Sequence, residues 1–317
     1  MSARTPPGLI QGRQGANLLS ANSLPEENAG AGVHPTSPGH TFFVTPPQVV
    51  DASWRGAGGP LNWRMIATWE LALLFATGLG AGFVDSVAGG GGLITLPVLL
   101  SVCPDPRVAL GTNKLQASFG SGSATFHFAR AGALTWRDCG RGCLLAFAGS
   151  LAGSLLVQGL DPAWLKKLIP AVLLVVAGYV ALKPKLGERD IHPRISPLQF
   201  DLFWAFGIGM YDGFIGPGTG TFWAMACMLG LGFNLARATA HTKALNFASN
   251  VASLTVFLAV GKVLFVAGLT MGAGQWLGAK AGSHMVMTRG TRFIRPVFLT
   301  AVILVTVKMI YTAWWPR

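Results

Sequence analysis

Apolar runs, separated by short polar or glycine-rich stretches, fill most of the chain from residue 65 onwards. A helix needs about 20 apolar residues to cross the hydrocarbon core of a bilayer. Eight runs are long enough to cross, namely 65–87, 114–131, 142–160, 167–183, 198–215, 243–260, 264–283 and 294–315. Two more apolar pieces, Leu93–Cys103 and Thr221–Phe233, are too short to cross comfortably alone. The pattern predicts an all-α integral membrane protein with eight full-length spans and two short segments.

Composition agrees with a membrane protein. Of the 317 residues, 51% are hydrophobic and 11% are charged, with a mean hydropathy of +0.49, whereas soluble domains carry about 25% charged residues. Residues 1–62 differ, being rich in Pro, Gly, Ser and Asn with no net charge. Such a segment buries too little apolar surface to offset the entropy lost on ordering. We therefore predict that 1–62 is a disordered tail.

The net charge of +12 lies outside this tail, in Lys and Arg residues that cluster between the apolar runs. Cytoplasmic loops of membrane proteins have this character, so the charge indicates topology and we expect no nucleic-acid partner. The four cysteines, Cys103, Cys139, Cys143 and Cys227, show no zinc-binding spacing. We expect no metal, no cofactor and no enzymatic activity.

One pattern of glycines and a carboxylate, G-x-G-x-x-D-x-x-x-G-x-G, occurs twice, 127 residues apart (212 minus 85). Its defining residues are Gly80, Gly82, Asp85, Gly89 and Gly91 in the first copy and Gly207, Gly209, Asp212, Gly216 and Gly218 in the second. Each copy places one Asp at the end of an apolar run, where a carboxylate is tolerated only beside a polar cavity or a cation. The glycines predict a break in the helix after each Asp.

The repeat extends beyond this motif. Thr112-Asn113-Lys114 aligns with His241-Thr242-Lys243 at an offset of 129, and Gly149 and Gly153 align with Gly278 and Gly282. Small residues at this spacing let helices approach closely in lipid. We therefore predict two homologous repeats, 63–190 and 191–317, each with one span, one short segment and three spans. Interrupted segments at matching positions of two halves are typical of a transporter binding site.

The topology depends on whether the short segments cross. If they cross, Lys and Arg are in excess on one face, whereas re-entrant segments would divide them evenly. The positive-inside rule therefore favours ten crossings, with both termini outside and the repeats inverted. An eight-span arrangement with re-entrant segments stays open.

The duplicated polar residues are the candidates for substrate binding. Lys114 and Lys243 are natural anion ligands, and the alternative is that they reach towards lipid headgroups. Helix N-termini after the glycine breaks would add backbone N–H donors, and side-chain amides would add more. The predicted substrate-binding residues are Asn113, Lys114, Lys243, Asn246, Gly89, Gly91, Gly216 and Gly218.

Asp85, Asp212 and His241 are predicted to couple or gate transport. The alternative for each Asp is to brace the broken helix by accepting hydrogen bonds from nearby backbone N–H groups. His241 lies between repeated polar positions and could titrate near neutral pH.

Four ordered segments carry a resemblance to a known family. They are GFVDSVAGGGGLITLP (82–97), ALGTNKLQA (109–117), YDGFIGPGTG (211–220) and ATAHTKALN (238–246). In these segments the chain resembles the TauE/SafE sulfite exporters, or TSUP permeases, and most of all their YfcA-like branch. The resemblance covers about residues 65–315. It implies a multi-pass permease of the cytoplasmic membrane for small sulfur-containing anions such as sulfite, sulfonates and sulfoacetate. Homo-oligomerisation is left open.

A rival interpretation is an intramembrane aspartyl protease, because the chain has two membrane Asp residues. That chemistry needs two carboxylates close enough to share a proton. The G-x-G-D motif does not occur here, since two residues separate the second glycine from each Asp. Asp residues at equivalent repeat positions, beside glycine breaks and Lys-bearing helices, favour transport.

Overall fold

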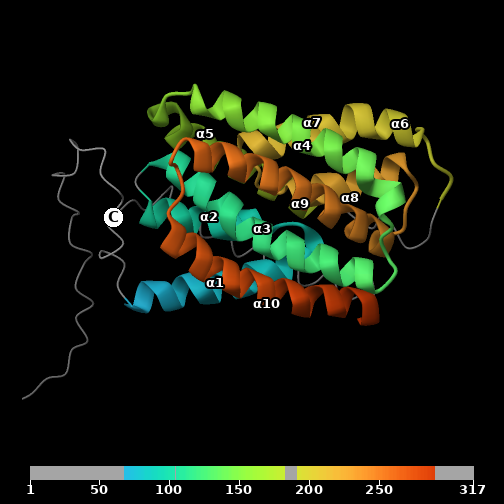
Figure 1. Ribbon diagram of the computed structural model, residues 1–317, viewed down its shortest axis with the longest axis horizontal. Helices are drawn as coiled ribbons and strands as arrows, with labels where there is room; N and C mark the ends of the chain where they lie inside the picture. The colour runs from blue at the N-terminus through green and yellow to red at the C-terminus, as the bar shows by residue number, and fades with distance from the viewer. Residues whose placement is uncertain (1–67, 104, 183–190, 290–317) are drawn as a thin grey trace, which may run out of the picture. The chain divides into compact units, whose positions relative to one another are not determined.

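A computed structural model describes residues 68–103, 105–182 and 191–289, and every element in those ranges is helical (Figure 1). The helices are α1 (Thr68–Ala88), α2 (Gly91–Val102), α3 (Pro106–Arg130), α4 (Trp136–Gln158), α5 (Pro162–Leu182), α6 (Pro197–Gln199), the π-helix η3 (Phe200–Ala205), α7 (Phe206–Phe214), α8 (Thr219–Gly230), α9 (Leu235–Ala259) and α10 (Phe265–Arg289). The helical fold class is therefore confirmed. The predicted tail at 1–62 and the predicted span at 294–315 lie outside the described residues.

The predicted breaks occur where the glycines lie. α1 ends at Ala88, and Gly89 follows with a φ of +79°. α7 ends at Phe214, before Gly216 and Gly218 at φ +90° and +75°. Glycine adopts this left-handed backbone without the steric cost that other residues meet. The helices after the breaks, α2 and α8, have 12 residues each, or about 18 Å at 1.5 Å per residue, so neither spans a bilayer core of about 30 Å alone.

Two equivalent 25-residue helices, α3 and α9, form the centre of the molecule. The Asp105 side chain caps α3 by accepting from Arg107 N at 2.9 Å, and the Asn234 side chain caps α9 by accepting from Arg237 N at 3.0 Å. Just after the end of α9, Lys262 pairs with Asp105 at 3.0 Å. The end of α9 therefore lies beside the start of α3, and the two helices run antiparallel.

Glycines let helices from different halves of the sequence pack backbone against backbone. On α1 and α10, a Cβ at Gly78 would collide with the carbonyl of Met271, and one at Gly278 with the carbonyl of Leu79. On α4 and α7, a Cβ at Gly153 would collide with the carbonyl of Met210. Figure 1 shows α1 beside α10 and α4 beside α7. Each half of the sequence thus packs its long helices against the other half.

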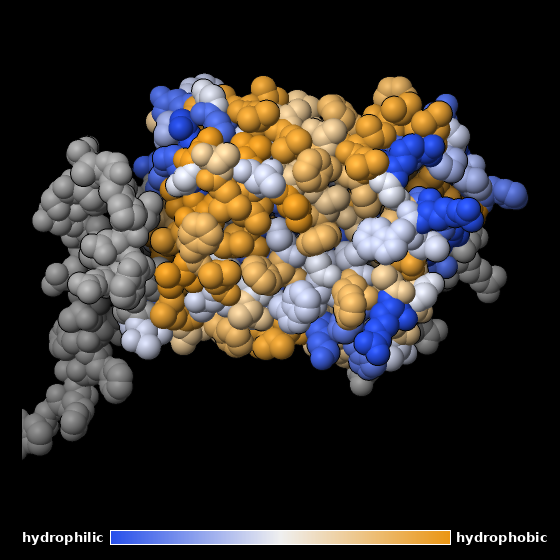
Figure 2. All heavy atoms as spheres, in the orientation of Figure 1, coloured by the Kyte–Doolittle hydropathy of each residue, from blue (hydrophilic) through white to orange (hydrophobic). Residues whose placement is uncertain are grey.

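The face of the molecule in Figure 2 is largely apolar. Figure 2 shows orange side chains across the middle of the visible face and blue ones mainly towards its ends. Large apolar residues such as Leu144 and Phe203 are more than 70% exposed. Of the described helices, α1 and α4 are long and apolar enough to cross a membrane by length and hydropathy alone. α3 and α9 have lower hydropathy because they carry many polar residues, and most of those residues are buried inside the bundle.

Candidate functional site

Two buried ion pairs connect the halves at the glycine breaks. Lys114 Nζ on α3 lies 2.7 Å from Asp212 Oδ1 on α7. Lys243 Nζ on α9 lies 2.8 Å from Asp85 Oδ2 on α1. Both lysine side chains are at most 2% exposed, and a buried ammonium needs a charged partner to offset the loss of hydration. Each repeated Lys thus forms an ion pair with the repeated Asp of the other half of the sequence.

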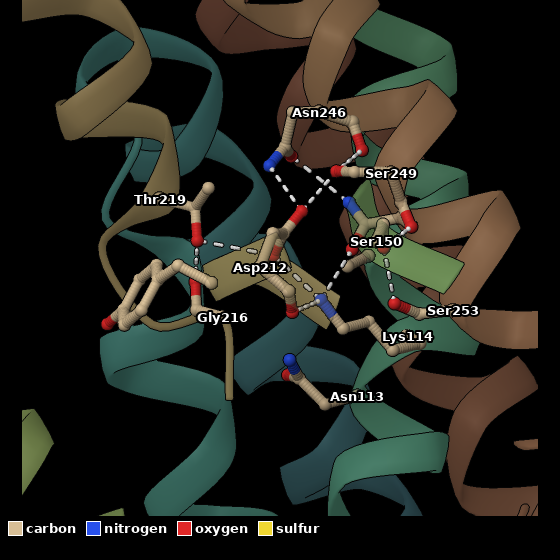
Figure 3. Close-up of polar contacts among 12 residues, drawn as sticks. Asn113, Lys114, Ser150, Asp212, Gly216, Thr219, Asn246, Ser249 and Ser253 are labelled. Carbon is tan, nitrogen blue, oxygen red and sulfur yellow. Dashed lines mark hydrogen bonds and ion pairs between the residues drawn. The ribbon is translucent and has the colours of Figure 1, made fainter. Parts of the chain in front are cut away.

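Asp212 lies at the centre of a dense polar cluster (Figure 3). Its Oδ2 accepts hydrogen bonds from the Ser249 hydroxyl and from Asn246 Nδ2, the latter at 3.4 Å. Its Oδ1 accepts from Thr219 Oγ1 at 3.2 Å in addition to Lys114. Lys114 Nζ also donates to the backbone carbonyl of Asp212. Both carboxylate oxygens are therefore engaged, and the side chain is 3% exposed.

Asp85 has fewer partners. Besides Lys243, it accepts one hydrogen bond from Gly91 N at 3.2 Å. This bond ties the end of α1 to the first residue of α2, so Asp85 makes the bracing contact considered above for a carboxylate beside a helix break. Its side chain is 16% exposed.

The two broken segments touch at their glycines. A Cβ on Gly220 would lie 2.5 Å from Gly89 Cα, so backbone meets backbone with no room for a side chain. Thr221 Oγ1 donates to the Ala88 carbonyl at 3.0 Å beside this contact. A Cβ on Gly216 would lie 2.8 Å from Asp212 Oδ1 and 2.9 Å from Lys114 Nζ. The repeated glycines therefore make space both for the crossing and for the ion pair.

A small polar cavity of about 20 Å³ lies at this crossing, with room for about one water molecule. It is lined by both carboxylate residues, by glycines of both breaks and by four side-chain amides. The lining residues are Asp85, Gly89, Gly92, Asn113, Ala117, Asp212, Gly216, Gly218, Thr219, Gly220, Asn246, Asn250 and Gln275.

Most of the residues selected from the sequence meet at this cavity. Asp85, Asp212, Asn113, Asn246, Gly89, Gly216 and Gly218 line it. Lys114, Lys243 and Gly91 do not line the cavity and instead contact its carboxylates. In this conformation both lysines are paired with Asp, and their role in substrate binding stays a prediction.

His241 lies apart from the lining residues. Its ring meets the Phe233 ring edge-on, with centroids 5.3 Å apart, and the guanidinium of Arg237 stacks on the same Phe233 ring at 4.0 Å. The equivalent residue of the first half, Thr112, accepts a hydrogen bond from Leu264 N at 2.9 Å. A coupling role for His241 stays a prediction.

Six lining residues were not selected from the sequence, namely Gly92, Ala117, Thr219, Gly220, Asn250 and Gln275. Thr219 lies within the YDGFIGPGTG segment, so its place after a predicted break could have indicated it. Gln275 had no such signal, because the equivalent residue of the first half is Ala146 at the offset of 129.

Comparison with known proteins identifies the family of this chain. A family model described as sulfite exporter TauE/SafE matches residues 74–309, which is more than half of the chain. The chain belongs to the TauE/SafE family. One relative is a probable membrane transporter protein of Haemophilus influenzae. It is 46% identical over 245 residues, which cover 77% of this chain and 96% of that protein.

Two further relatives have similar names. A probable membrane transporter protein ORF9 of a Sinorhizobium species is 44% identical over 240 residues, covering 76% of this chain and 92% of the relative. The probable membrane transporter protein YfcA of Escherichia coli K12 is 42% identical over 247 residues, covering 78% and 92%. No solved structure was found to match this chain. The chain is thus a membrane transporter of the TauE/SafE family, and no relative supports the protease alternative.

Proposed function

We propose that this protein is a secondary transporter that carries a small sulfur-containing oxyanion, of the sulfite, sulfonate or sulfoacetate class, across the cytoplasmic membrane. The observation that carries the proposal is two ion pairs around one cavity, Lys114 with Asp212 and Lys243 with Asp85, each of which joins one half of the sequence to the other. Buried ionisable residues inside membrane bundles are costly and commonly mark a substrate path.

The charges explain how an anion would be admitted and released. In the closed arrangement, two ammonium groups balance two carboxylates, so the site carries no net charge for an anion. Movement of one half against the other would separate a Lys from its Asp and expose an ammonium group to the cavity. Asp85 and Asp212 therefore act as gates that compete with the substrate for the lysines.

The remaining predicted residues complete the site in this proposal. The amides of Asn113 and Asn246 and the backbone around Gly89, Gly91, Gly216 and Gly218 contribute donors to anion oxygens. His241 acts from outside the cavity lining, through the start of α9, as a coupling group.

Alternating access would come from the repeats 63–190 and 191–317 moving against each other, with ten crossings and inverted topology. The antiparallel packing of α3 and α9 supports this, since equivalent helices of inverted repeats point in opposite directions. Thiol labelling tests it, with single cysteines placed at the exposed, equivalent positions Ala131 and Val260 in a chain whose four native cysteines are replaced. Inverted repeats put these equivalent positions on opposite faces of the membrane, and labelling of both from one face would contradict the topology.

The function is tested by flux into proteoliposomes that contain the purified full chain. Sulfite, sulfoacetate, taurine and thiosulfate are each supplied with and without a pH gradient. We expect uptake of at least one sulfur oxyanion, and a loss of that uptake in Lys114→Ala and Lys243→Ala. Absence of flux for all four anions would overturn the substrate class. Unchanged flux in both lysine variants would overturn the site.

For the rival activity, the same preparation is incubated with a model single-span peptide substrate. We expect no cleavage. Cleavage that disappears in Asp85→Asn and in Asp212→Asn would replace the transporter with a protease.

A further inference from the structure

Four side-chain amides line the cavity, and two of them are already used within the protein. Asn246 donates to Asp212 Oδ2 at 3.4 Å, and its own oxygen accepts from Asn250 Nδ2 at 3.1 Å. Asn250 Oδ1 in turn accepts from Lys114 Nζ at 3.4 Å. These two amides therefore serve the cluster around Asp212.

Gln275 on α10 is different, because its Oε1 is buried without a hydrogen-bond partner among the described residues, and the residue is 2% exposed. Its Oε1 lies in a slot between two other helices. A Cβ on Gly82 of α1 would lie 2.7 Å from this oxygen, and a Cβ on Gly120 of α3 would lie 2.5 Å from it. Both positions must lack a side chain for Gln275 to fit.

With Oε1 in this slot, the amide nitrogen points away from Gly82 and Gly120. Oε1 and Nε2 diverge from the same planar carbon, so an oxygen held between Gly82 and Gly120 leaves the nitrogen on the other side of the group. Gln275 also lines the cavity. The NH₂ group, with two donors and no acceptor lone pair, is therefore the part of the side chain available to a molecule in the cavity.

Asn113 on α3 presents a second donor in a similar way. Its Oδ1 accepts from Thr95 Oγ1 at 2.6 Å and from Gln116 Nε2 at 2.8 Å. These two donors fix the oxygen, so the Asn113 NH₂ group points away from them, and the residue lines the same cavity. In Figure 3, Asn113 lies outside the hydrogen-bonded cluster of Asp212.

We propose that Gln275 is a substrate-binding residue whose amide N–H groups, together with those of Asn113, donate to oxygens of the transported oxyanion. This inference rests on the proposed function. Gln275 has no counterpart in the first half of the sequence, where the equivalent position holds Ala146. Neutral donors suit this place because they bind anion oxygens while the charges of both lysines are still balanced by Asp.

The test uses the full chain in proteoliposomes, with sulfite as the first probe. Gln275→Leu removes both donors at similar volume, and Gln275→Glu keeps the shape but places a carboxylate against the anion. A lost hydrogen bond to a charged group changes affinity by about tenfold to a hundredfold. We expect KM to rise by about that factor in Gln275→Leu and further in Gln275→Glu.

Gln158→Leu is the matched control, because Gln158 is a helical glutamine on α4 whose amide, among the described residues, bonds to the Ser154 carbonyl of its own helix and lies outside the cavity lining. We expect its KM to match the wild type. Thermal unfolding in detergent separates binding from folding, so the proposal requires a higher KM in a variant that still folds. If Gln275→Leu does not fold, the isosteric Gln275→Glu gives the answer. An unchanged KM in a folded Gln275 variant would show that the amide only packs, and would overturn the proposal.

Failure of the proposed function gives a different result. A wild-type protein that carries another oxyanion, such as nitrate, and no sulfur anion would overturn the sulfur assignment alone. The Gln275 comparison is then made with nitrate and has the same two outcomes. A wild-type protein that carries no oxyanion would overturn both proposals.

Discussion

The two Lys–Asp pairs hold equivalent positions in the two halves of the sequence, but their surroundings differ. Among the residues that the structure describes, Asp212 accepts hydrogen bonds from three side chains besides Lys114, whereas Asp85 accepts the backbone N–H of Gly91 besides Lys243. The exposed fraction of the side chain is 3% for Asp212 and 16% for Asp85.

The residues at equivalent positions explain this difference. The partners of Asp212 that come from α9, Asn246 and Ser249, have Ala117 and Gly120 as their equivalents on α3 at the offset of 129. Neither equivalent can donate from a side chain. Both halves carry the charges but only the second carries these hydrogen-bonding neighbours, so we expect the Asp85–Lys243 pair to open more readily.

Asp212→Asn should have the largest effect on stability. It leaves the Lys114 ammonium buried without a carboxylate, and breaking a buried pair in this way costs about 3–5 kcal/mol. Asp85→Asn should cost less, because Asp85 is more exposed and has fewer partners. The midpoint of thermal unfolding in detergent measures both, and equal losses would refute the asymmetry.

Gly89→Ala should come second. Its φ of +79° strains any other residue by about 1–2 kcal/mol, and its Cβ would press on the Gly220 backbone, an overpacking that costs about 1–3 kcal/mol. In Gly220→Ala the new Cβ would press on the Gly89 backbone, but Gly220 has helical backbone angles and no strained φ. Its loss of stability should therefore be smaller. The control is Gly80→Ala, where a Cβ meets nothing within 4 Å. A Gly80→Ala variant as unstable as Gly89→Ala would show that the crossing is not the cause.

Ser249→Ala should come third, with a loss of about 1.5–3 kcal/mol from one hydrogen bond to a charged group. Denaturant unfolding compares it with Ser118→Ala, whose hydroxyl bonds only to the Lys114 carbonyl one turn earlier at 2.8 Å. If both variants lose the same stability, the dense network around Asp212 is not what distinguishes the two pairs.

Lys262→Ala should have the smallest effect. Its pair with Asp105 is 3.0 Å long but partly exposed on both sides, and such pairs contribute less than about 1 kcal/mol. The effect should shrink further in high salt, where exposed charges are screened. Thermal unfolding in detergent measures this loss of stability. A loss as large as that of Asp212→Asn would show that burial does not determine how much each ion pair stabilises the protein.

The sequence predicted what depends on local pattern. The breaks after Asp85 and Asp212 could be predicted because glycine conformation is decided within a few residues. The choice of Lys114 and Lys243 as important residues followed from the repeat alone.

The pairing of each Lys with the Asp of the other half could not be predicted in the same way. Lys114 and Asp212 are 98 residues apart, and the packing of α9 against both α3 and α7 brings them together. Gln275 shows the same limit, because its slot depends on Gly82 and Gly120 from two other helices. No periodicity along one segment encodes such a slot.

The packing of α1 against α10 has a consequence for biosynthesis. Translation from the end of α1 at Ala88 to the start of α10 at Phe265 requires 177 more residues (265 minus 88), which takes roughly 10–35 s at typical synthesis rates. During that interval, the glycine face of α1 must wait in the membrane without its partner. Among the described helices, the first, α1, therefore gains its packing partner only when the last, α10, is made. If translation stops early, the glycine face of α1 stays exposed to lipid and to other nascent proteins.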